Sequence, residues 1–540
     1  MTFSVKSRRG IILFLVSIVI AMLAVGSLSL LALLTTEYEA AIFRGDEIQA
    51  GQLVQSGMEF LGQTLGSSES SSISETEWSN SFDSSGSFYF SQQISAEQSR
   101  FHRLYDNPVQ FCGVEVVPGH WDRPSRGAGR FTVFSPRIEQ DKLKGIRFGL
   151  VNESTRLHLG TVLEWETELA GQGSHALLKL PGMTPTMADS ILDWIDADKT
   201  HRSSGAELDY YERIGVAYRP RNALPATLEE LLLVRDVTRS LLFGTDEKFF
   251  YGADMNDLQR FQPEIDWQND LLFQPREGVE TINSMDSTEF SETNIPASFF
   301  DDLTGTNIET ENGTVLPWCF LLTTLSAEKL VDPTGNAKIF LNDSNLEFLG
   351  EQLRGKLDEE SCQFILAWRR NNGLIDDPVD LLDAVIEEKE NEKELKSKSP
   401  FSLENSVGEE KFLTLLDVAS VSSEIVVSGR INVNEAPQIV LETVPELDKQ
   451  TVLQIVNRRG VPGEKRQGKY RHLIWLLSEK IVDKAMMKKL SKRLTTGGDV
   501  YRAQIIGFFD GQGTVNRAEV VIDATVKPPR PVFTKNLSSL

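Results

Sequence analysis

The chain has 540 residues, of which 40% are hydrophobic and 25% charged, and this composition is typical of a globular protein with a sizeable core. Lysine and arginine number 55 against 78 acidic residues, and the resulting net charge of −23 disfavours binding to nucleic acid phosphates. Three cysteines are too few for a disulfide framework.

The N-terminus predicts a membrane anchor. Lys6, Arg8 and Arg9 precede Gly10, and the next twenty-four residues, 11–34, carry no charge. A helix rises about 1.5 Å per residue, so this run spans about 36 Å and can cross a bilayer with some tilt. The basic side should stay in the cytoplasm, which places the bulk of the chain on the other side of the membrane.

The order of residues in this leader carries further information. Residues 6–13 (KSRRGIIL) resemble the leader of type IV pilin-like proteins, which a prepilin peptidase cuts after the glycine. The cut would then fall between Gly10 and Ile11, with N-methylation at Ile11. The fifth mature residue is normally glutamate in these proteins, but here it is Leu15. A member type that dispenses with this acid is the pseudopilin called general secretion pathway protein K.

A single long helix is predicted to continue beyond the membrane. Apolar residues keep helical spacing through residues 35–66, so this part is expected to be amphipathic. Residues 67–100 are rich in serine, glutamate and glycine and predict a flexible insertion. Residues 101–148 contain short β-like runs, such as Phe111–Val117 and Arg130–Phe134, and predict a β region.

Three later stretches repeat one pattern of a short helix, a tight turn and a second helix with apolar residues three and four apart. They lie at Leu177–Trp194, Ile339–Arg369 and Ile431–Arg458, within predicted helical units at residues 149–250, 339–386 and 412–498. The repetition predicts stacked helical pairs.

Less regular segments separate these units. Residues 251–338 form a predicted acidic linker region, and residues 387–411 a charged linker whose Glu/Lys run, 387–398, is predicted as a solvated helix or linker. Apolar residues alternate again within residues 499–540, on both sides of the glycines at 511 and 513, and predict an antiparallel hairpin.

The turn Leu180–Met183 (LPGM) resembles a helix-hairpin-helix turn, which in other proteins offers backbone amides to DNA phosphates. Close approach of a phosphate requires a second glycine where this chain has Thr184. The next helix carries Asp189 and Asp193 and no lysine or arginine. A structural hairpin is therefore predicted in place of a DNA-binding one.

Five carboxylates gather around one loop, namely Asp193, Asp196, Asp198, Glu207 and Asp209. Their spacing differs from that of an EF-hand, but they could hold Ca²⁺, which takes six to eight oxygen ligands. Solvated acids at a capped helix end are the alternative. Acid–base catalysis by the same groups would need a cleft and a perturbed pKa.

The remaining candidate residues form no catalytic motif. The six histidines lack metal-ligand spacing, and the chain has neither a nucleophile elbow nor a phosphate-binding loop. Cys112, Cys319 and Cys362 allow one bridge, Cys319 to Cys362, or three separate thiols. The sequence therefore predicts a non-enzymatic protein without a cofactor, unless the five carboxylates hold calcium.

A succession of motifs after the β region extends the indication from the leader. They are Phe148–Glu153 (FGLVNE), Asp193–Asp198 (DWIDAD), Gly205–Glu207 with Tyr210 and Tyr211, Tyr218–Pro220, and Leu228–Thr238. In this order they resemble general secretion pathway protein K, the large minor pseudopilin of type II secretion. The resemblance is specific over residues 1–70 and 145–245 and looser afterwards, where the chain carries an extra helical repeat and two insertions.

This resemblance implies an α+β fold, in which a pilin-like long N-terminal helix and an antiparallel sheet are interrupted by a large all-α insertion of helix-hairpin-helix-like (SAM-like) repeats. It also implies a single-pass inner-membrane protein, with its N-terminus in the cytoplasm and its bulk in the periplasm. There it would cap the tip of a pseudopilus and help to start its assembly for protein export across the outer membrane. The implied partners are the minor pseudopilins I and J, the major pseudopilin, the inner-membrane assembly platform and the prepilin peptidase, with no nucleic acid.

Three alternatives use the same features differently. A tip minor pilin of a type IV pilus would share the leader and the helix. A membrane-anchored helix-hairpin-helix DNA-binding protein would need basic hairpin faces, and the acidic ones count against it. An anchored hydrolase built on the carboxylate loop would lose activity on Asp196→Ala.

Overall fold

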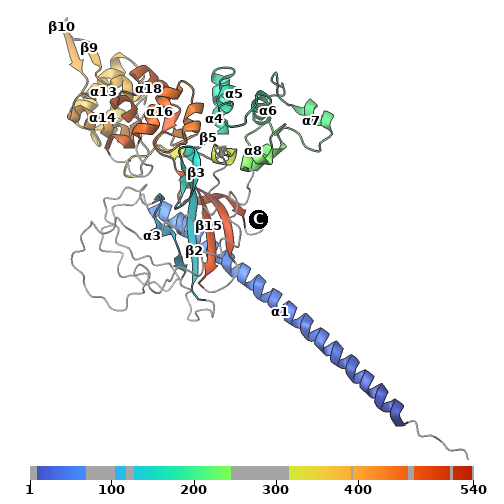
Figure 1. Ribbon diagram of the computed structural model, residues 1–540. Coiled ribbons are helices and arrows are strands. Elements are labelled where there is room, and N and C mark those ends of the chain that lie inside the picture. The colour runs from blue at the N-terminus through green and yellow to red at the C-terminus, as the bar shows by residue number, and fades with distance from the viewer. Residues whose placement is uncertain are drawn as a thin grey trace, which may run out of the picture.

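The computed structural model describes residues 9–67, 104–116, 127–244, 316–390, 393–459, 468–510 and 515–537 (Figure 1). Four predicted segments fall outside this range: residues 1–8 of the leader, the serine-rich insertion beyond residue 67, residues 251–315 of the acidic linker, and the hairpin tip at residues 511–513.

Helix α1, Arg9–Ser67, confirms the prediction of one long N-terminal helix. Hydroxyls in its apolar half donate to carbonyls one turn earlier, Ser17 to Leu13 at 2.9 Å and Ser27 to Leu23 at 2.8 Å, so these donors need no water. In Figure 1 this half extends away from the body of the protein as a long rod.

The main sheet is antiparallel and joins two parts of the chain that are far apart in sequence. Five strands follow in the order β1-β2-β15-β16-β17, while β3 pairs with β2 and β4 pairs with β15. The strands are β1 Val114–Val116, β2 Gly129–Glu139, β3 Lys142–Phe148, β4 Val151–Asn152, β15 Val500–Phe509, β16 Asn516–Asp523 and β17 Arg530–Asn536. The predicted C-terminal hairpin is confirmed as β15–β16, and the edge strand β17 adds to it.

The C-terminal half of α1 packs on this sheet. Val54, Leu61 and Leu65 are buried with apolar side chains of β2, β15 and β16. Gly57 faces the sheet so closely that a Cβ there would lie 2.7 Å from Ile505 Cγ2. The helix can therefore approach the strands only because this residue has no side chain.

The chain leaves the sheet after β4 and returns at β15, and the described residues between them are largely helical. The first part has α4 Leu159–Glu168, α5 Gln172–Leu177, α6 Pro185–Ile195, α7 Leu208–Ile214, η2 Leu228–Leu233 and α8 Arg239–Phe243. The second has η4 Trp318–Phe320, α12 Leu346–Arg354, α13 Glu359–Asn371 and η5 Pro378–Leu381. The third has α14 Ser406–Val418, α15 Gln438–Thr443, α16 Lys449–Arg458, η6 Gly468–Arg471, α17 Trp475–Ser478 and α18 Lys484–Leu490.

One hydrophobic core connects these helices, and short two-stranded ladders tie the parts together. The ladders are β5 Leu157–His158 with β6 Leu322–Thr323, β7 Ala327–Lys329 with β12 Val426–Ser428, β8 Ile339–Phe340 with β11 Ala419–Ser420, and β13 Ile431–Asn432 with β14 Leu494–Thr495. Figure 1 shows the helical region beyond the end of the sheet that lies opposite the free end of α1.

Helix pairs occur in all three predicted stretches, as α5–α6, α12–α13 and α15–α16. The turns of the first and third are alike: the N–H of Met183 donates to Leu180 O and that of Leu447 to Val444 O, both at 3.2 Å. The residue before each donor has a left-handed backbone, with φ 69° at Gly182 and 71° at Glu446. The second pair turns differently, through Gly355 at φ −73°.

The same turn also joins η2 to α8, a pair that was not predicted. Val237 N–H donates to Val234 O at 3.2 Å, and Asp236 between them has φ 63°. The turns before α8 and α16 thus place an acidic residue, Asp236 or Glu446, at the left-handed position where the turn before α6 has Gly182.

Of the two predictions for the Glu/Lys run, a helix or a linker, the helix is wrong. Strands β9 Val385–Glu390 and β10 Lys393–Lys398 form an antiparallel hairpin. Its backbone register aligns Val385 with Lys398 at the open end of the hairpin and Glu390 with Lys393 at its turn. The three cysteines are free thiols in this structure, and Cys362 is buried.

Candidate functional site

The exposed half of α1 is the first candidate site. Within the described residues, one helix is long and apolar enough to cross a membrane, and its most apolar stretch is not buried in the protein at all. Leu15 belongs to this surface and is 58% exposed. Gly10 and Ile11, the predicted cleavage pair, lie in the first turns of the helix.

The structure brings together three of the five predicted calcium ligands. One carboxylate oxygen each from Asp196, Asp198 and Glu207 lie within 4.8 Å of one another. Asp196 ends helix α6 and Glu207 caps α7, so the loop between the two helices sets their separation. Asp209, in the first turn of α7, lines a neighbouring open hollow of about 360 Å³.

Asp193 is instead neutralised by an arginine. Arg202 Nη1 lies 2.7 Å from Asp193 Oδ1 and 2.5 Å from Asp196 Oδ2, and the Arg202 backbone N–H also donates to Asp193. The arginine thus holds the loop against the end of α6.

Two buried oxygens in this group have no hydrogen-bond partner in the described part of the chain, Asp196 Oδ1 and Glu207 Oε1. Burial raises the pKa of both carboxyl groups, and neighbouring carboxylates raise it further. A divalent cation would supply the missing partner for both oxygens, so the residues present fit a hard, oxygen-preferring ion.

A second cluster, which sequence reasoning did not find, lies where the helical region meets the sheet. We call Glu153, Arg156, Arg502 and Glu519 the junction ion cluster. Glu153 Oε1 lies 3.3 Å from Arg156 Nη1 and 2.6 Å from Arg502 Nε, and Arg502 Nη1 lies 3.1 Å from Glu519 Oε1. The Thr323 hydroxyl also donates to Glu153.

Burial alone would raise the pKa of Glu153, but the arginines Arg156 and Arg502 outweigh it and lower that pKa to about 2. The side chain is fully buried and remains charged at neutral pH. Because Glu153 and Arg502 are 349 residues apart, no local motif could have revealed their pairing.

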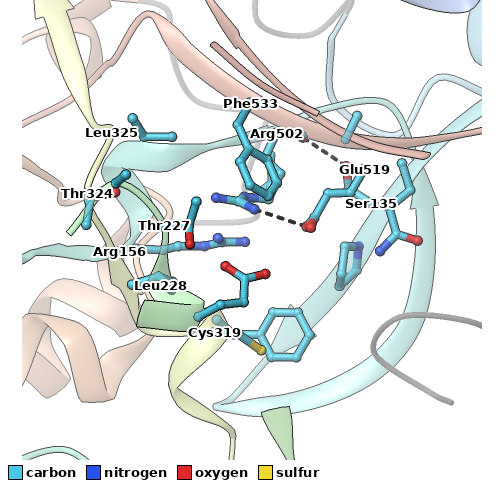
Figure 2. Close-up of a pocket in the computed structure, with 17 residues that line it drawn as sticks. Ser135, Arg156, Thr227, Leu228, Cys319, Thr324, Leu325, Arg502, Glu519 and Phe533 are labelled. Carbon is cyan, nitrogen blue, oxygen red and sulfur yellow. Dashed lines mark hydrogen bonds and ion pairs between the residues drawn. The ribbon is translucent and has the colours of Figure 1, made fainter. Parts of the chain in front are cut away.

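A small pocket of about 40 Å³ opens beside the junction ion cluster (Figure 2). Ser135, Arg502, Glu519 and Phe533 line it from the sheet, and Thr227, Leu228, Cys319 and Thr324 line it from the helical region. Its volume suits a few water molecules and is too small for a substrate. The cluster and its pocket therefore form a structural joint.

These surfaces define a class of protein, one that carries a mixed α+β body at the end of a long helix suited to a membrane. The family model of protein K of the type II secretion system matches residues 160–243, which hold α4 to α8. The chain therefore carries a protein K region, and the resemblance to this family is confirmed there. No curated protein matches the chain.

Proposed function

We propose that the protein is a minor pseudopilin of a type II secretion system, which caps the tip of the pseudopilus and helps to start its assembly. The observation that carries the proposal is helix α1, whose apolar N-terminal half is exposed while its C-terminal half packs on an antiparallel sheet. This pilin-like arrangement occurs in the same chain as the protein K match.

Two features support the tip position. In a filament, a glutamate at the fifth mature residue is thought to neutralise the N-terminal amine of a neighbouring subunit above. A tip subunit has no such neighbour, so Leu15 loses nothing there and lowers the cost of the membrane-embedded state. The helical region beyond the sheet would collide with neighbours inside a packed filament but not at its end.

The proposed partners are the minor pseudopilins I and J, the major pseudopilin and the assembly platform in the inner membrane. Tyr38, Phe43 and Ile48 lie beyond the uncharged run of α1 and are more than 60% exposed. Helices of other pseudopilins would cover these side chains in the assembled tip.

Leader cleavage tests the pilin-like part of this proposal. When the chain is expressed with a prepilin peptidase, mass spectrometry should find a mature N-terminus at Ile11 carrying a methyl group. Gly10→Val should abolish cleavage, whereas Gly26→Val, at an open position on the same helix, should leave it intact. An uncut Met1, or a cut beyond Leu34, would contradict the proposal.

A gene deletion separates a secretion system from a type IV pilus. The deletion strain should retain its exported proteins in the periplasm and keep its surface pili. Loss of pili with normal secretion would favour the tip pilin of a type IV pilus.

We also propose that the helix pairs are helix-hairpin-helix-like (SAM-like) repeats with a structural role. The shared turn of the pairs ending in α6, α8 and α16 supports this assignment. Asp236 and Glu446 would repel a phosphate at the turn position where DNA-binding modules need glycine.

We further propose that Asp196, Asp198 and Glu207 bind one Ca²⁺. Adding Ca²⁺ to protein stripped with a chelator should raise its Tm, because an ion that binds only the folded state stabilises it by about 2.7 kcal/mol at a hundred times Kd. Affinity should fall as the pH is lowered, because burial raises the pKa of Asp196 and of Glu207 and protons then compete with the ion.

Glu207→Gln should remove the response to Ca²⁺, whereas Glu212→Gln, an exposed position on the same helix, should keep it. An unchanged Tm in wild-type protein, or an equal response in both variants, would count against calcium.

A further inference from the structure

The polar hollow of about 360 Å³ adjoins the three carboxylates of the proposed calcium site. Its volume lies in the range of about 300–1,000 Å³ that is typical of ligand pockets, unlike the pocket beside the junction ion cluster. Glu207 belongs both to the lining of the hollow and to the group of three carboxylates. An ion held by these carboxylates would therefore lie beside the hollow.

The walls of the hollow come from several parts of the chain. The loop between α6 and α7 contributes Ser203 and Ser204, helix α7 contributes Tyr210 and Arg213, and the turn between η2 and α8 contributes Arg235. Every residue that lines the hollow is polar, charged or glycine. Hydroxyl and guanidinium groups donate hydrogen bonds, so these walls suit a ligand with negatively charged oxygens.

The three carboxylates give a calcium ion only part of its coordination, because one oxygen of each already accepts a hydrogen bond. The donors are Arg202 Nη1 to Asp196 Oδ2 at 2.5 Å, Thr200 N–H to Asp198 Oδ1 at 2.6 Å, and Leu208 N–H to Glu207 Oε2 at 3.2 Å. With one remaining oxygen each, they supply about three of the six to eight ligands that Ca²⁺ takes. Other oxygens must complete the shell, and a ligand in the hollow is placed to supply them.

Glu207 gives separate evidence for a ligand. This residue is 3% exposed, and its Oε1 has no hydrogen-bond partner in the described part of the chain. A buried oxygen of this kind costs free energy unless a donor or a cation binds to it. A bound ion satisfies this oxygen and also places positive charge at the wall of the hollow.

Arg213 supplies a cation that the described fold does not use in an ion pair. Its guanidinium lies 5.8 Å from the centre of the Tyr210 ring. The other guanidinium at this ring, that of Arg235, is already held, because Nη1 donates to Gly205 O at 3.4 Å and Nε lies 3.6 Å from Asp236. The cation–π contact positions Arg213 at the hollow and leaves its N–H groups available to a ligand.

The features of the hollow favour a carboxylate that is carried by another protein. Glu207 and Asp209 line the hollow and repel an anion, whereas Ca²⁺ bound at Glu207 attracts one. His201, Asp209 and Arg213 are exposed, so a small acid would stay largely in water, but a side chain on a protein surface would not. Figure 1 shows α7 at the outer edge of the helical region, where a partner can reach it.

We propose that the hollow docks an acidic side chain of a partner protein, whose carboxylate shares the calcium ion with Glu207 and pairs with Arg213. The docking rests on the calcium site proposed above, and it makes that ion the switch for an interaction with a partner. This site is separate from the exposed face of α1.

The test uses the full chain in a non-ionic detergent and a fluorescent peptide of alternating glutamate and glycine. With Ca²⁺ present, the wild-type protein should bind this peptide, and a chelator should weaken binding by about tenfold or more. A peptide with glutamine in place of glutamate should not bind. The net charge of −23 repels an acidic peptide, so binding would report a local site.

Arg213→Gln distinguishes the docking site from the calcium site. This variant should bind the peptide about tenfold more weakly, yet its Tm should still rise with Ca²⁺, because Arg213 is not one of the three carboxylates. The matched control is Arg219→Gln, which removes the same charge at an exposed position that does not line the hollow. It should keep its affinity within about threefold, since exposed charges act locally at moderate salt.

The outcomes separate the two proposals. A Tm that rises with Ca²⁺ in wild-type protein that binds no peptide would overturn the docking site and leave the calcium site intact. A Tm that does not respond to Ca²⁺ would refute the calcium site and the docking with it. Equal peptide affinity with and without Ca²⁺, an equal loss in the two arginine variants, or displacement of the peptide by acetate at the same carboxylate concentration would also overturn the docking site.

Discussion

Glu153 shows how a single side chain can join two parts of a protein. It directly follows strand β4 of the sheet. Its carboxylate accepts a hydrogen bond from the Thr323 hydroxyl of the helical region and forms an ion pair with Arg502 on β15. A buried charge of this kind is stable only while its partners surround it. The residue therefore fixes the position of the helical region against the sheet.

Replacing Glu153 by glutamine should lower the free energy of unfolding by about 3–5 kcal/mol, because Arg156 and Arg502 would stay buried without their shared counter-charge. Urea denaturation of wild type and variant measures the difference. Glu139→Gln is the control, since its pair with Arg137 is exposed and contributes at most about 1 kcal/mol.

The stability of wild type and of Glu153→Gln should depend differently on pH in the acidic range. The pKa of Glu153 is lowered from 4.5 to about 2 on folding, so its stabilising effect is complete above pH 4.5 and disappears as pH falls towards 2. Glu153→Gln should lack this part of the acid dependence. Parallel acid denaturation curves would contradict the assigned role.

The turns of the helix pairs make a second residue-level prediction. Gly182→Ala should destabilise the protein by about 1–2 kcal/mol, because φ is 69° there and a Cβ would lie 2.7 Å from Leu241. Gly355→Ala should instead be neutral or stabilise by up to about 1 kcal/mol, because φ is −73°. Equal Tm changes in the two variants would show that backbone conformation is not the cause.

Elements that depend on local pattern were predictable, and elements that depend on distant partners were not. The uncharged run of residues 11–34 predicted the first half of α1, and the alternation of apolar residues predicted the β15–β16 hairpin. The Glu/Lys run has helical composition, yet it begins with the β-branched residues Val385 and Ile386 and forms the β9–β10 hairpin. Strand β17 has no alternation of apolar residues, and it forms because its backbone pairs with the edge of β16.

The packing of α1 on the sheet can be tested at Gly57. Gly57→Ala should destabilise the protein by about 1–3 kcal/mol, since the new methyl would meet Ile505 at 2.7 Å and Phe131 at 3.1 Å. Gly45→Ala, at an open position on the same helix, should stabilise by up to about 1 kcal/mol. Thermal unfolding in detergent tests both, and a stable Gly57→Ala protein would refute this close approach.

At the scale of the whole molecule, the sequence predicted the β segments and the helical region but not the contacts that connect them. The carboxylates Asp196, Asp198 and Glu207 could be named because they share one loop. The contact of Arg202 with Asp193 depends on the conformation of the loop. The junction ion cluster depends on two segments, around Glu153 and Arg502, that meet only after folding. The pattern of the sequence indicated a helical insertion between a β region and a C-terminal hairpin, but it did not show that β2 and β15 pair in one sheet.

The pairing of β2 with β15 has a consequence for the synthesis of the chain. Gly129 pairs with Phe509, 380 residues later, so β2 is made long before its neighbour exists. At about 5–20 residues per second, the ribosome needs roughly 20–80 s to reach β15. The helix pairs are local and can form during this interval, whereas the edge of β2 that binds β15 and the face of α1 that packs on β15 must wait. Newly made protein should therefore need protection by a chaperone on these two surfaces until its last strands emerge.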